Sequence, residues 1–473
     1  MTIRKALLAL SALAVPAAAA AQYGMPWPAP PMPMPPSAPV RAEPWMPPPP
    51  GVQAPQPQGQ AAARNRAPAL EPIDLPPAIE QGVDMIYIDQ ELVPRAVQDS
   101  RLLHDISFDD WSGAPVDLFL PVNPVYTDLR RALVRYQQRW GDLPQVPVPS
   151  GPTLKPNSTD ERVALLRERL GLPGGEKFDQ PLANAVKEFQ SVHGLKADGI
   201  AGAGTIAALN RGVQYYQQLI IINMERAKRL PAPEEQRKFV LVDSGSARLT
   251  MWENGRVVDS MKLVVGKAET ATPMMAAYIR HVSVNPYWNV PPELVRSLIG
   301  PRVLAQGVSY LTEREYQVLS GYGDDARPLD PNSIDWQSVV DGRQEVRLRR
   351  LPSPANSMGA MKFMLPNYFG IYLHDTPERG HFDKNELWIS NGCVRVEDYK
   401  RLARWLFDGH VPTGRDPKVE EDVKLPQPVP VYMTYLTVLP TASGVQFLAD
   451  PYGKDAHLME RYGSRMMAAA NGN

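Results

Sequence analysis

The sequence predicts an α+β protein of several domains, in which helical segments precede a β-rich segment. The chain has 473 residues, and a domain usually takes roughly 100–200 residues, so two to four domains are expected. In residues 122–141, 154–211 and 213–229, apolar residues recur every three or four positions, as on one face of a helix. From Phe239 onward they alternate with polar residues, which is the period of a half-buried strand.

The composition excludes several classes of protein. Lys and Arg total 50 against 51 Asp and Glu, so the net charge of -1 argues against a nucleic-acid partner. The single cysteine, Cys393, excludes an intramolecular disulfide and a cysteine-based zinc or iron–sulfur cluster. The histidines are scattered, and neither a P-loop nor a convincing dinucleotide-binding fingerprint occurs. We therefore expect no metal and no cofactor.

Residues 1–21 have the pattern of a signal peptide. Arg4 and Lys5 form the positive region, residues 6–15 are the apolar core, and small residues follow as cleavage sites. A membrane anchor is the alternative reading. Spanning a bilayer takes about 20 apolar residues, however, and Pro16 interrupts this run. We expect a mature protein without a transmembrane segment, located in the periplasm.

Residues 22–71 are too rich in proline to form a helix or a sheet, and they predict a disordered, semi-rigid linker. Residues 72–150 are expected to form the first part of a helical scaffold domain. An amphipathic helix pattern at 122–141 supports this, because its apolar residues recur at spacings of three and four. A second scaffold helix is expected within 212–235.

Residues 151–211 predict a compact unit of three helices. The first would be capped by one of residues 158–160 and end near Leu170, the second would cover about 180–192, and the third 205–209. The unit resembles the peptidoglycan-binding domain of many wall enzymes. The resemblance is carried by Leu166, Leu170, the run 185–190, Gly194-Leu195, Asp198-Gly199-Ile200 and residues 205–209. It concerns the fold, since the apolar positions explain packing and identify no ligand contact.

Residues 236–440 are expected to form the β-rich domain. The stretch 239–266 predicts three strands, with Asn254-Gly255 as a type I′ turn between the second and third. Residues 292–350 look like a long insertion, and we expect a lid there. Further strands are expected in 281–291, 362–366, 370–375, 388–396 and 429–440, a helix in 397–407, and a C-terminal tail in 441–473.

His374 and Cys393 are the candidate catalytic pair. A thiol attacks as its thiolate, with an ordinary pKa of about 8.5, so it needs a nearby base or a positive field. An imidazole supplies that base and later protonates the leaving amine. Gly392 would let backbone amides approach a substrate carbonyl, as an oxyanion hole requires. The alternative is that Cys393 is only a small buried hydrophobe.

We expect two further side chains to share strand faces with Cys393 and His374. On an extended strand, Arg395 would share the face of Cys393, where it could bind a carboxylate or favour the thiolate. Tyr372 would share a face with His374. It could line the pocket there, although core packing explains it equally well.

The run from Ser390 to Arg395, with a histidine before it, closely resembles the catalytic motif of the L,D-transpeptidases. Residues 285–291, 362–367 and 372–377 are similar to the large Gram-negative branch of that family. That branch joins a β-rich catalytic domain to a helical scaffold and a peptidoglycan-binding domain. The resemblance implies Cys393 as nucleophile and His374 as general base and acid. It also implies an oxyanion and substrate-binding role for Ser390, Asn391, Gly392, Arg395 and Tyr372.

One position departs from the family pattern. Many members have a histidine where Asn391 stands, so no assisting role of a second histidine can be carried over. His374 must then be oriented by another acceptor, either a backbone carbonyl or Asp375. The carboxylate of Asp375 could also point to the opposite side of the strand. His381 is expected to be an exposed loop residue.

The resemblance implies a two-step acyl transfer in the cell wall. Cys393 would attack the third residue of a tetrapeptide stem, release D-Ala and pass the acyl group to the amine of a neighbouring stem. Peptidoglycan stem peptides and glycan are the implied partners. Water as acceptor would make the protein an L,D-carboxypeptidase or amidase, and a protein amine would make it an enzyme that anchors envelope proteins. The alternative from a different functional class is a non-catalytic scaffold protein that binds the cell wall.

Overall fold

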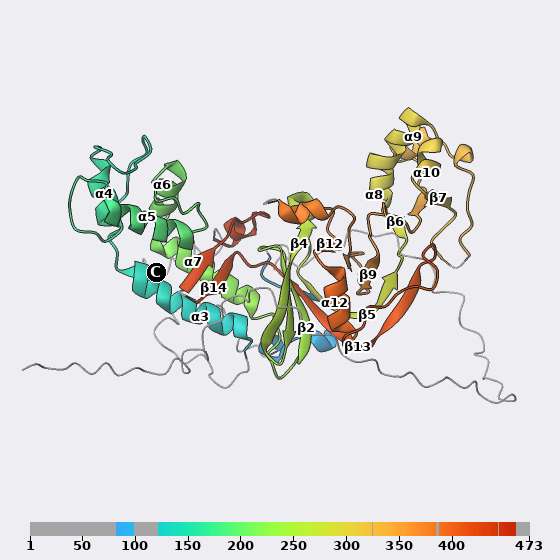
Figure 1. Cartoon of the computed structure of the whole chain (residues 1–473), viewed down its shortest axis with the longest axis horizontal. Helices are drawn as coiled ribbons and strands as arrows, with labels where there is room; N and C mark the ends of the chain where they lie inside the picture. The colour runs from blue at the N-terminus through green and yellow to red at the C-terminus, as the bar shows by residue number, and fades with distance from the viewer. Residues whose placement is uncertain (1–81, 99–121, 324, 385–386, 443, 460–473) are drawn as a thin grey trace, which may run out of the picture.

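The computed structural model describes residues 82–98 and 122–459, apart from 324, 385–386 and 443. The expected signal peptide, the proline-rich linker and part of the first scaffold segment lie outside the described residues. The described chain is a mixed α+β protein, with a helical part and a compact insertion on opposite sides of a central sheet (Figure 1).

The helical part contains the amphipathic segments predicted from the sequence. Asn123 caps α3 by accepting a hydrogen bond from the Tyr126 N–H at 2.9 Å, and Asp179 caps α5 in the same way through Leu182 at 3.1 Å. One continuous apolar core joins these helices to one another. The helices are α3 (Pro124–Tyr136), η4 (Gln137–Gly141), α4 (Arg162–Arg169), α5 (Gln180–Val192), α6 (Ala203–Asn210) and α7 (Gly212–Ala227).

The central sheet closes on itself, because β9 pairs with both β10 and β5. Around the ring the order is β5-β13-β2-β3-β4-β12-β10-β9. In addition, β1 pairs in parallel with the start of β5, and β11 pairs with β4. These strands are β1 (Ile86–Tyr87), β2 (Lys238–Asp243), β3 (Arg248–Glu253), β4 (Arg256–Gly266), β5 (Met275–Val284), β9 (Met361–Met364), β10 (Leu373–His374), β11 (Trp388–Ser390), β12 (Val394–Val396) and β13 (Glu421–Thr434).

Alternation along the strands fills the inside of this ring with apolar side chains. Leu373, Val394 and Phe363 are buried in one core, and the apolar face of α12 (Tyr399–Leu406) packs against it. Polar neighbours in the same strands therefore point outward.

The predicted turn at Asn254 and Gly255 is present between β3 and β4, with φ of 50° and 73°, as a type I′ turn requires. The short elements η1 (Gln90–Leu92), α2 (Arg95–Gln98), η5 (Ala268–Thr270) and η8 (Arg379–Asp383) lie outside this ring's order.

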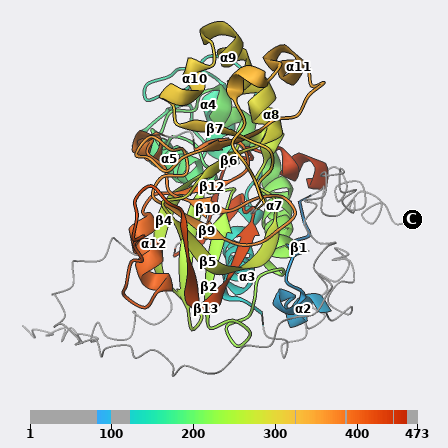
Figure 2. The same cartoon turned by 90° about the vertical axis from the view of Figure 1, so that its right-hand side faces the viewer.

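The insertion is a small folded unit rather than a loop. It has an apolar core of its own, which includes Val290, Trp336 and Leu348. Its sheet has the order β6-β8-β7 within the described residues. The elements are β6 (Trp288–Val290), α8 (Pro292–Leu294), η6 (Val295–Ile299), α9 (Gly300–Gln306), α10 (Ser309–Glu313), β7 (Tyr316–Leu319), η7 (Pro331–Ser333), α11 (Trp336–Val340) and β8 (Arg347–Arg350). Figure 2 shows this unit rising from the sheet. Its role as a lid stays a prediction.

The chain beyond residue 440 differs from the expected tail. Strands β14 (Val438–Thr441) and β15 (Gly444–Phe447) form an antiparallel pair. Val438, Val445 and Phe447 are buried in the helical core, so this pair returns to the helices. A tail was expected because the pair is short and its partners lie far away in the sequence.

Candidate active site

The only cysteine of the sequence lies just after a tight turn between β11 and β12. The Ser390 hydroxyl donates to the Cys393 carbonyl at 2.7 Å, and the Gly392 N–H donates to the Ser390 oxygen at 3.2 Å. Gly392 has a φ of +113°, where L-residues with a Cβ are strained. An added Cβ there would also lie 3.1 Å from Ile371 Cδ1. The turn therefore requires glycine at 392, while Asn391 is exposed at its tip.

A neighbouring segment holds the turn in place from outside. The Thr270 hydroxyl donates to the Ser390 carbonyl at 3.1 Å, and the Thr272 hydroxyl donates to the Gly392 carbonyl at 2.8 Å. Thr272 Oγ1 also accepts from the Gly266 N–H at 3.0 Å, which ties this segment to the end of β4. Since Thr272 is buried, these bonds are shielded from water.

Parallel pairing of β10 with β12 brings the predicted site residues onto one face. Leu373 is in register with Val394, and both are buried in the inner core. His374 is in register with Arg395, so their side chains leave on the outer face, with Cys393 and Tyr372 two residues before them. The rings of Tyr372 and His374 have centroids 5.8 Å apart. The outer face of β10 and β12 thus carries a thiol, an imidazole, a phenol and a guanidinium.

His374 is held as a neutral base. Its side chain is only 2% exposed, and its Nδ1 lies 2.6 Å from the main-chain oxygen of Asp375. A carbonyl oxygen only accepts hydrogen bonds, so Nδ1 carries the proton and Nε2 keeps its lone pair. Burial is the main cause that lowers the pKa of His374 to about 3, and the positive charges of Arg395 and Lys362 contribute to the same shift. The imidazole is therefore uncharged near neutral pH.

Cys393 is a partly buried thiol whose surroundings shift its pKa in opposite directions. Its Sγ lies 3.6 Å from the Gly370 carbonyl, to which the S–H donates. Burial raises the pKa of the Cys393 thiol, whereas hydrogen bonding to Tyr372 and the charges of Arg395 and Lys362 lower it. Because burial is the largest of these effects, the resting form is the thiol, and its reaction needs a proton acceptor.

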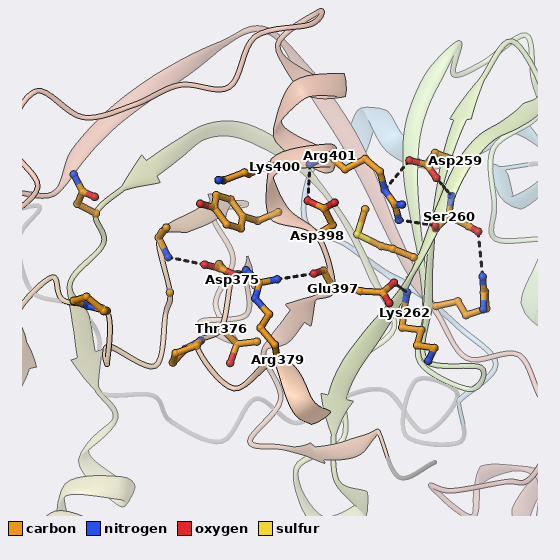
Figure 3. A pocket seen from close by; sticks show the side chains of 18 of the residues that line it. Asp259, Ser260, Lys262, Asp375, Thr376, Arg379, Glu397, Asp398, Lys400 and Arg401 are labelled. Atoms are coloured by element: carbon orange, nitrogen blue, oxygen red, sulfur yellow. Dashed lines mark hydrogen bonds and ion pairs between the residues drawn. The ribbon is translucent and has the colours of Figure 1, made fainter. Parts of the chain in front are cut away.

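Asp375 fixes His374 through its main chain and not through its carboxylate. The carboxylate accepts from the Ala360 N–H at 2.8 Å and pairs with Arg379. Figure 3 shows Asp375 and Arg379 in a cleft of about 1210 Å³, which is lined by polar residues and by the start of α12. Neither Cys393 nor His374 lines this cleft. Cations and carboxylates in this cleft pair with one another, as Arg401 does with Asp259 at 2.9 Å. We therefore interpret the cleft as a structural neighbour that holds the candidate site in place.

Arg395 lies beside His374 but already has a partner. Its Nη1 is 3.0 Å from Oε2 of Glu378, which also lies 3.1 Å from Nε2 of His381. His381 was expected to be exposed, yet it is half-buried because it packs into this cluster. Within the described residues, no three His, Cys, Asp or Glu side chains gather as metal ligands.

The sequence missed four residues that shape this site: Lys362, Glu378, Thr270 and Thr272. Lys362 is opposite His374 in the register of β9 and β10, and its Nζ pairs with Glu420 at 2.7 Å. No pattern in the sequence indicated which strand Lys362 would face. Glu378 and the two threonines come from loops, and their spacing from Cys393 carries no signal of contact.

Comparison with known proteins agrees with this geometry. Residues 237–423 match the family model of the L,D-transpeptidase catalytic domain, and residues 165–209 match one described as "Putative peptidoglycan binding domain". The barrel with the Cys393 turn thus lies in the region that matches the L,D-transpeptidase catalytic domain. Upstream of it, α4 to α6 lie in the region that matches the peptidoglycan-binding domain, so the chain is similar to both modules that its motifs indicated.

Individual relatives carry the same designation. A protein of Haemophilus influenzae named "Putative L,D-transpeptidase" is 30% identical over 247 residues, which is 51% of this chain and 49% of the relative. The chain therefore spans about half the length of that relative. A solved L,D-transpeptidase from Xylanimonas cellulosilytica (residues 123–326) is 18% identical, with 61% of this chain and 98% of that chain covered and a TM-score of 0.19. A solved L,D-transpeptidase from Mycobacterium smegmatis is 12% identical, with 43% of this chain and 60% of that chain covered and a TM-score of 0.21. These superpositions are poor and carry no argument about function.

Proposed function

We propose that this protein is a cysteine acyltransferase that cross-links peptidoglycan by L,D-transpeptidation. One observation carries the proposal. A neutral imidazole, with Nδ1 fixed on a carbonyl and Nε2 unprotonated, lies on the same strand face as the only thiol of the chain. The match to the catalytic-domain model supplies the substrate class.

In the proposed first step, Cys393 Sγ attacks the carbonyl carbon of the third residue of a tetrapeptide stem. The thiol proton passes to Nε2 of His374, and the C–N bond to the terminal D-Ala breaks. The same proton then goes to the leaving amine, which leaves a thioester. We assign the developing oxyanion to main-chain N–H groups of the turn 390–393, whose geometry Gly392 sets.

In the second step an amine of a neighbouring stem attacks the thioester carbonyl. His374 takes a proton from the attacking amine and returns it to the departing sulfur, so the thiol is restored. The product is an amide between the third residues of two stems. The sequence of covalent intermediates makes the reaction ping-pong.

The peptidoglycan-binding domain is proposed to hold the enzyme on its polymeric substrate, and the periplasm is the proposed location. Among the described residues, no helix has both the length and the apolar character needed to cross a bilayer. The predicted signal peptide lies outside the described residues, so export is tested by N-terminal sequencing of the protein isolated from cells.

Product analysis tests the proposed reaction. The mature protein is incubated with disaccharide-tetrapeptide, and the products are separated and weighed, with Cys393→Ala and His374→Asn as matched variants. We expect D-Ala and a cross-linked dimer from the wild type only. Tripeptide without dimer would mean that water resolves the thioester, so the enzyme is a hydrolase or lacks its true acceptor, such as a protein amine, in the mixture. Retained binding to sacculi without any product would favour a scaffold.

A further inference from the structure

The guanidinium beside the reactive pair is occupied by a side chain of the protein itself. Glu378, in the loop after β10, places Oε2 3.0 Å from Nη1 of Arg395. The Arg395 side chain is 20% exposed, whereas that of Glu378 is 60% exposed. The pair thus joins a mostly buried cation to a carboxylate that reaches it from solvent.

A second donor meets the same carboxylate oxygen. Nε2 of His381 lies 3.1 Å from Oε2 of Glu378, so one oxygen lies between an imidazole and a guanidinium. The Nδ1 atom of His381 is buried and has no hydrogen-bond partner among the described residues. Arg395 and His381 therefore form a cradle that fits a carboxylate oxygen.

This cradle adjoins the reactive groups. Arg395 is in register with His374 and lies two residues beyond Cys393 on the same strand face. The other charges around this face are already paired, because Lys362 binds Glu420 at 2.7 Å and Arg379 binds Asp375. An anionic ligand that reaches the thiol would meet Arg395 as the cation whose partner is easiest to displace.

We propose that Arg395 and His381 form a carboxylate subsite beside the thiol, which Glu378 fills in the free enzyme and a substrate carboxylate takes over by displacing Glu378. Only the identity of that substrate rests on the proposed function. Displacement costs little because the Glu378 carboxylate is 60% exposed and is hydrated again when it leaves. The incoming carboxylate restores the same charge pairing, so the buried guanidinium is never left without a partner.

The stem peptide carries several carboxylates, and two of them lie next to the attacked carbonyl. One is the terminal carboxylate of the D-Ala that leaves, and the other is a side-chain carboxylate on the third residue. Both have the chemistry that the cradle recognises. Which of them binds is an outcome of the second experiment below.

Alkylation of the single thiol tests the subsite without any wall substrate. The rates of Cys393 with iodoacetate and with iodoacetamide are measured at one pH, since the two reagents are similar in size and differ in charge. Their ratio reports how well the site accepts a carboxylate next to sulfur. We expect Glu378→Gln to raise the iodoacetate-to-iodoacetamide ratio about two- to fivefold, the range expected for an exposed ion pair.

Two variants serve as controls. Asp383→Asn removes an exposed negative charge from the same loop, and it should leave the ratio within experimental error of wild type. Glu378→Asp keeps the charge and should also stay near wild type. An unchanged ratio in Glu378→Gln, or an equal rise in Asp383→Asn, would overturn the subsite, with thermal unfolding showing that each variant is folded.

Binding of stem peptides then identifies the carboxylate. Calorimetry in a Cys393→Ala background compares disaccharide-tetrapeptide with versions amidated at the D-Ala terminus or at the third-residue carboxylate. The tightening caused by Glu378→Gln should vanish for the version that lacks the recognised carboxylate. If it persists for both versions, neither of these two carboxylates uses the cradle. If the alkylation ratio rises while no peptide binds, the proposed function fails and the subsite stands.

Discussion

His374 illustrates how burial and one main-chain contact can prepare the base that we propose. The Asp375 carbonyl fixes the proton on Nδ1, and burial keeps the ring neutral. The thiol stays protonated for the same reason, because burial raises the pKa of Cys393. We infer that proton transfer accompanies attack and that no thiolate–imidazolium pair exists at rest.

The expected pH profile of the reaction follows from the lowered pKa of His374 and the raised pKa of Cys393. The base form of His374 is complete well above its pKa of about 3 and is lost as the pH falls through that value. The raised thiol pKa moves the alkaline limb upward. We expect kcat/KM for tetrapeptide to be level from about pH 5 to about pH 8. An inflection near pH 6.5, the usual pKa of histidine, would contradict the buried neutral base.

Gly392 should be irreplaceable for a backbone reason. Gly392→Ala places a Cβ at a φ of +113° and 3.1 Å from Ile371 Cδ1. Strain of about 1–3 kcal/mol is expected, and the acylation rate should fall at least about tenfold as the turn shifts. Gly380→Ala is the matched control, because nothing lies within 4 Å of its added Cβ. Equal acylation rates in both variants would refute the role of the turn.

At the residue scale, composition and alternation in the sequence predicted the candidate site. One cysteine, preceded by a histidine at a predicted strand end, marked the chemistry, and period-two alternation placed Arg395 on the face of Cys393. Glu378 could not be predicted, since its contact with Arg395 depends on the path of the loop after β10.

At the scale of elements, the turn before Cys393 depends on a segment that carries none of the proposed catalytic groups. Thr272 bridges the Gly266 N–H and the Gly392 carbonyl, which joins the end of β4 to the turn before Cys393. Sequence alternation predicted the strands on both sides, but not this bridge. The insertion 288–350 shows the same limit, because its helices and strands are too short for their periodicity to stand out.

Thr272→Val tests how much that bridge contributes to stability and to the acylation of Cys393. The change keeps the shape of the side chain and leaves two buried main-chain groups without a partner, at a cost of about 1–3 kcal/mol. We expect a lower midpoint in urea and slower acylation of Cys393, while Thr272→Ser should retain most of both. Unchanged acylation in the valine variant would mean that the turn holds itself.

At the scale of the whole molecule, the last strands connect the peptidoglycan-binding region to the barrel. Phe447 of β15 stacks near the ring of His193, with centroids 5.3 Å apart, and His193 also stacks on Phe189 at 3.8 Å. Nδ1 of His193 lies 2.7 Å from the Phe189 carbonyl, and Nε2 lies 3.0 Å from the Tyr136 hydroxyl. A tail was expected here because no local pattern reveals a pairing with helices roughly 250 residues upstream.

The buried His193 predicts acid lability. Burial lowers its pKa to about 3, whereas the unfolded chain binds a proton near pH 6.5. Its stabilising effect is thus complete above pH 6.5 and is lost as the pH falls from there toward 3. Between pH 7 and pH 5 the loss is about 2 kcal/mol. Urea unfolding at both pH values should show a smaller drop in His193→Gln, and the usual drop in His410→Gln, whose side chain is exposed. Equal drops in the two variants would exclude this origin.

The central claim is that Cys393 becomes acylated with His374 as the base, and intact-mass measurement of the enzyme tests it most directly. The reduced protein is mixed with disaccharide-tetrapeptide and quenched in acid within a single turnover, beside Cys393→Ala and His374→Asn. We predict an adduct of the tetrapeptide mass less D-Ala on the wild type, none on Cys393→Ala, and formation slowed about 10²- to 10⁴-fold in His374→Asn. A wild-type protein that stays unmodified although its thiol reacts with iodoacetamide would contradict the account.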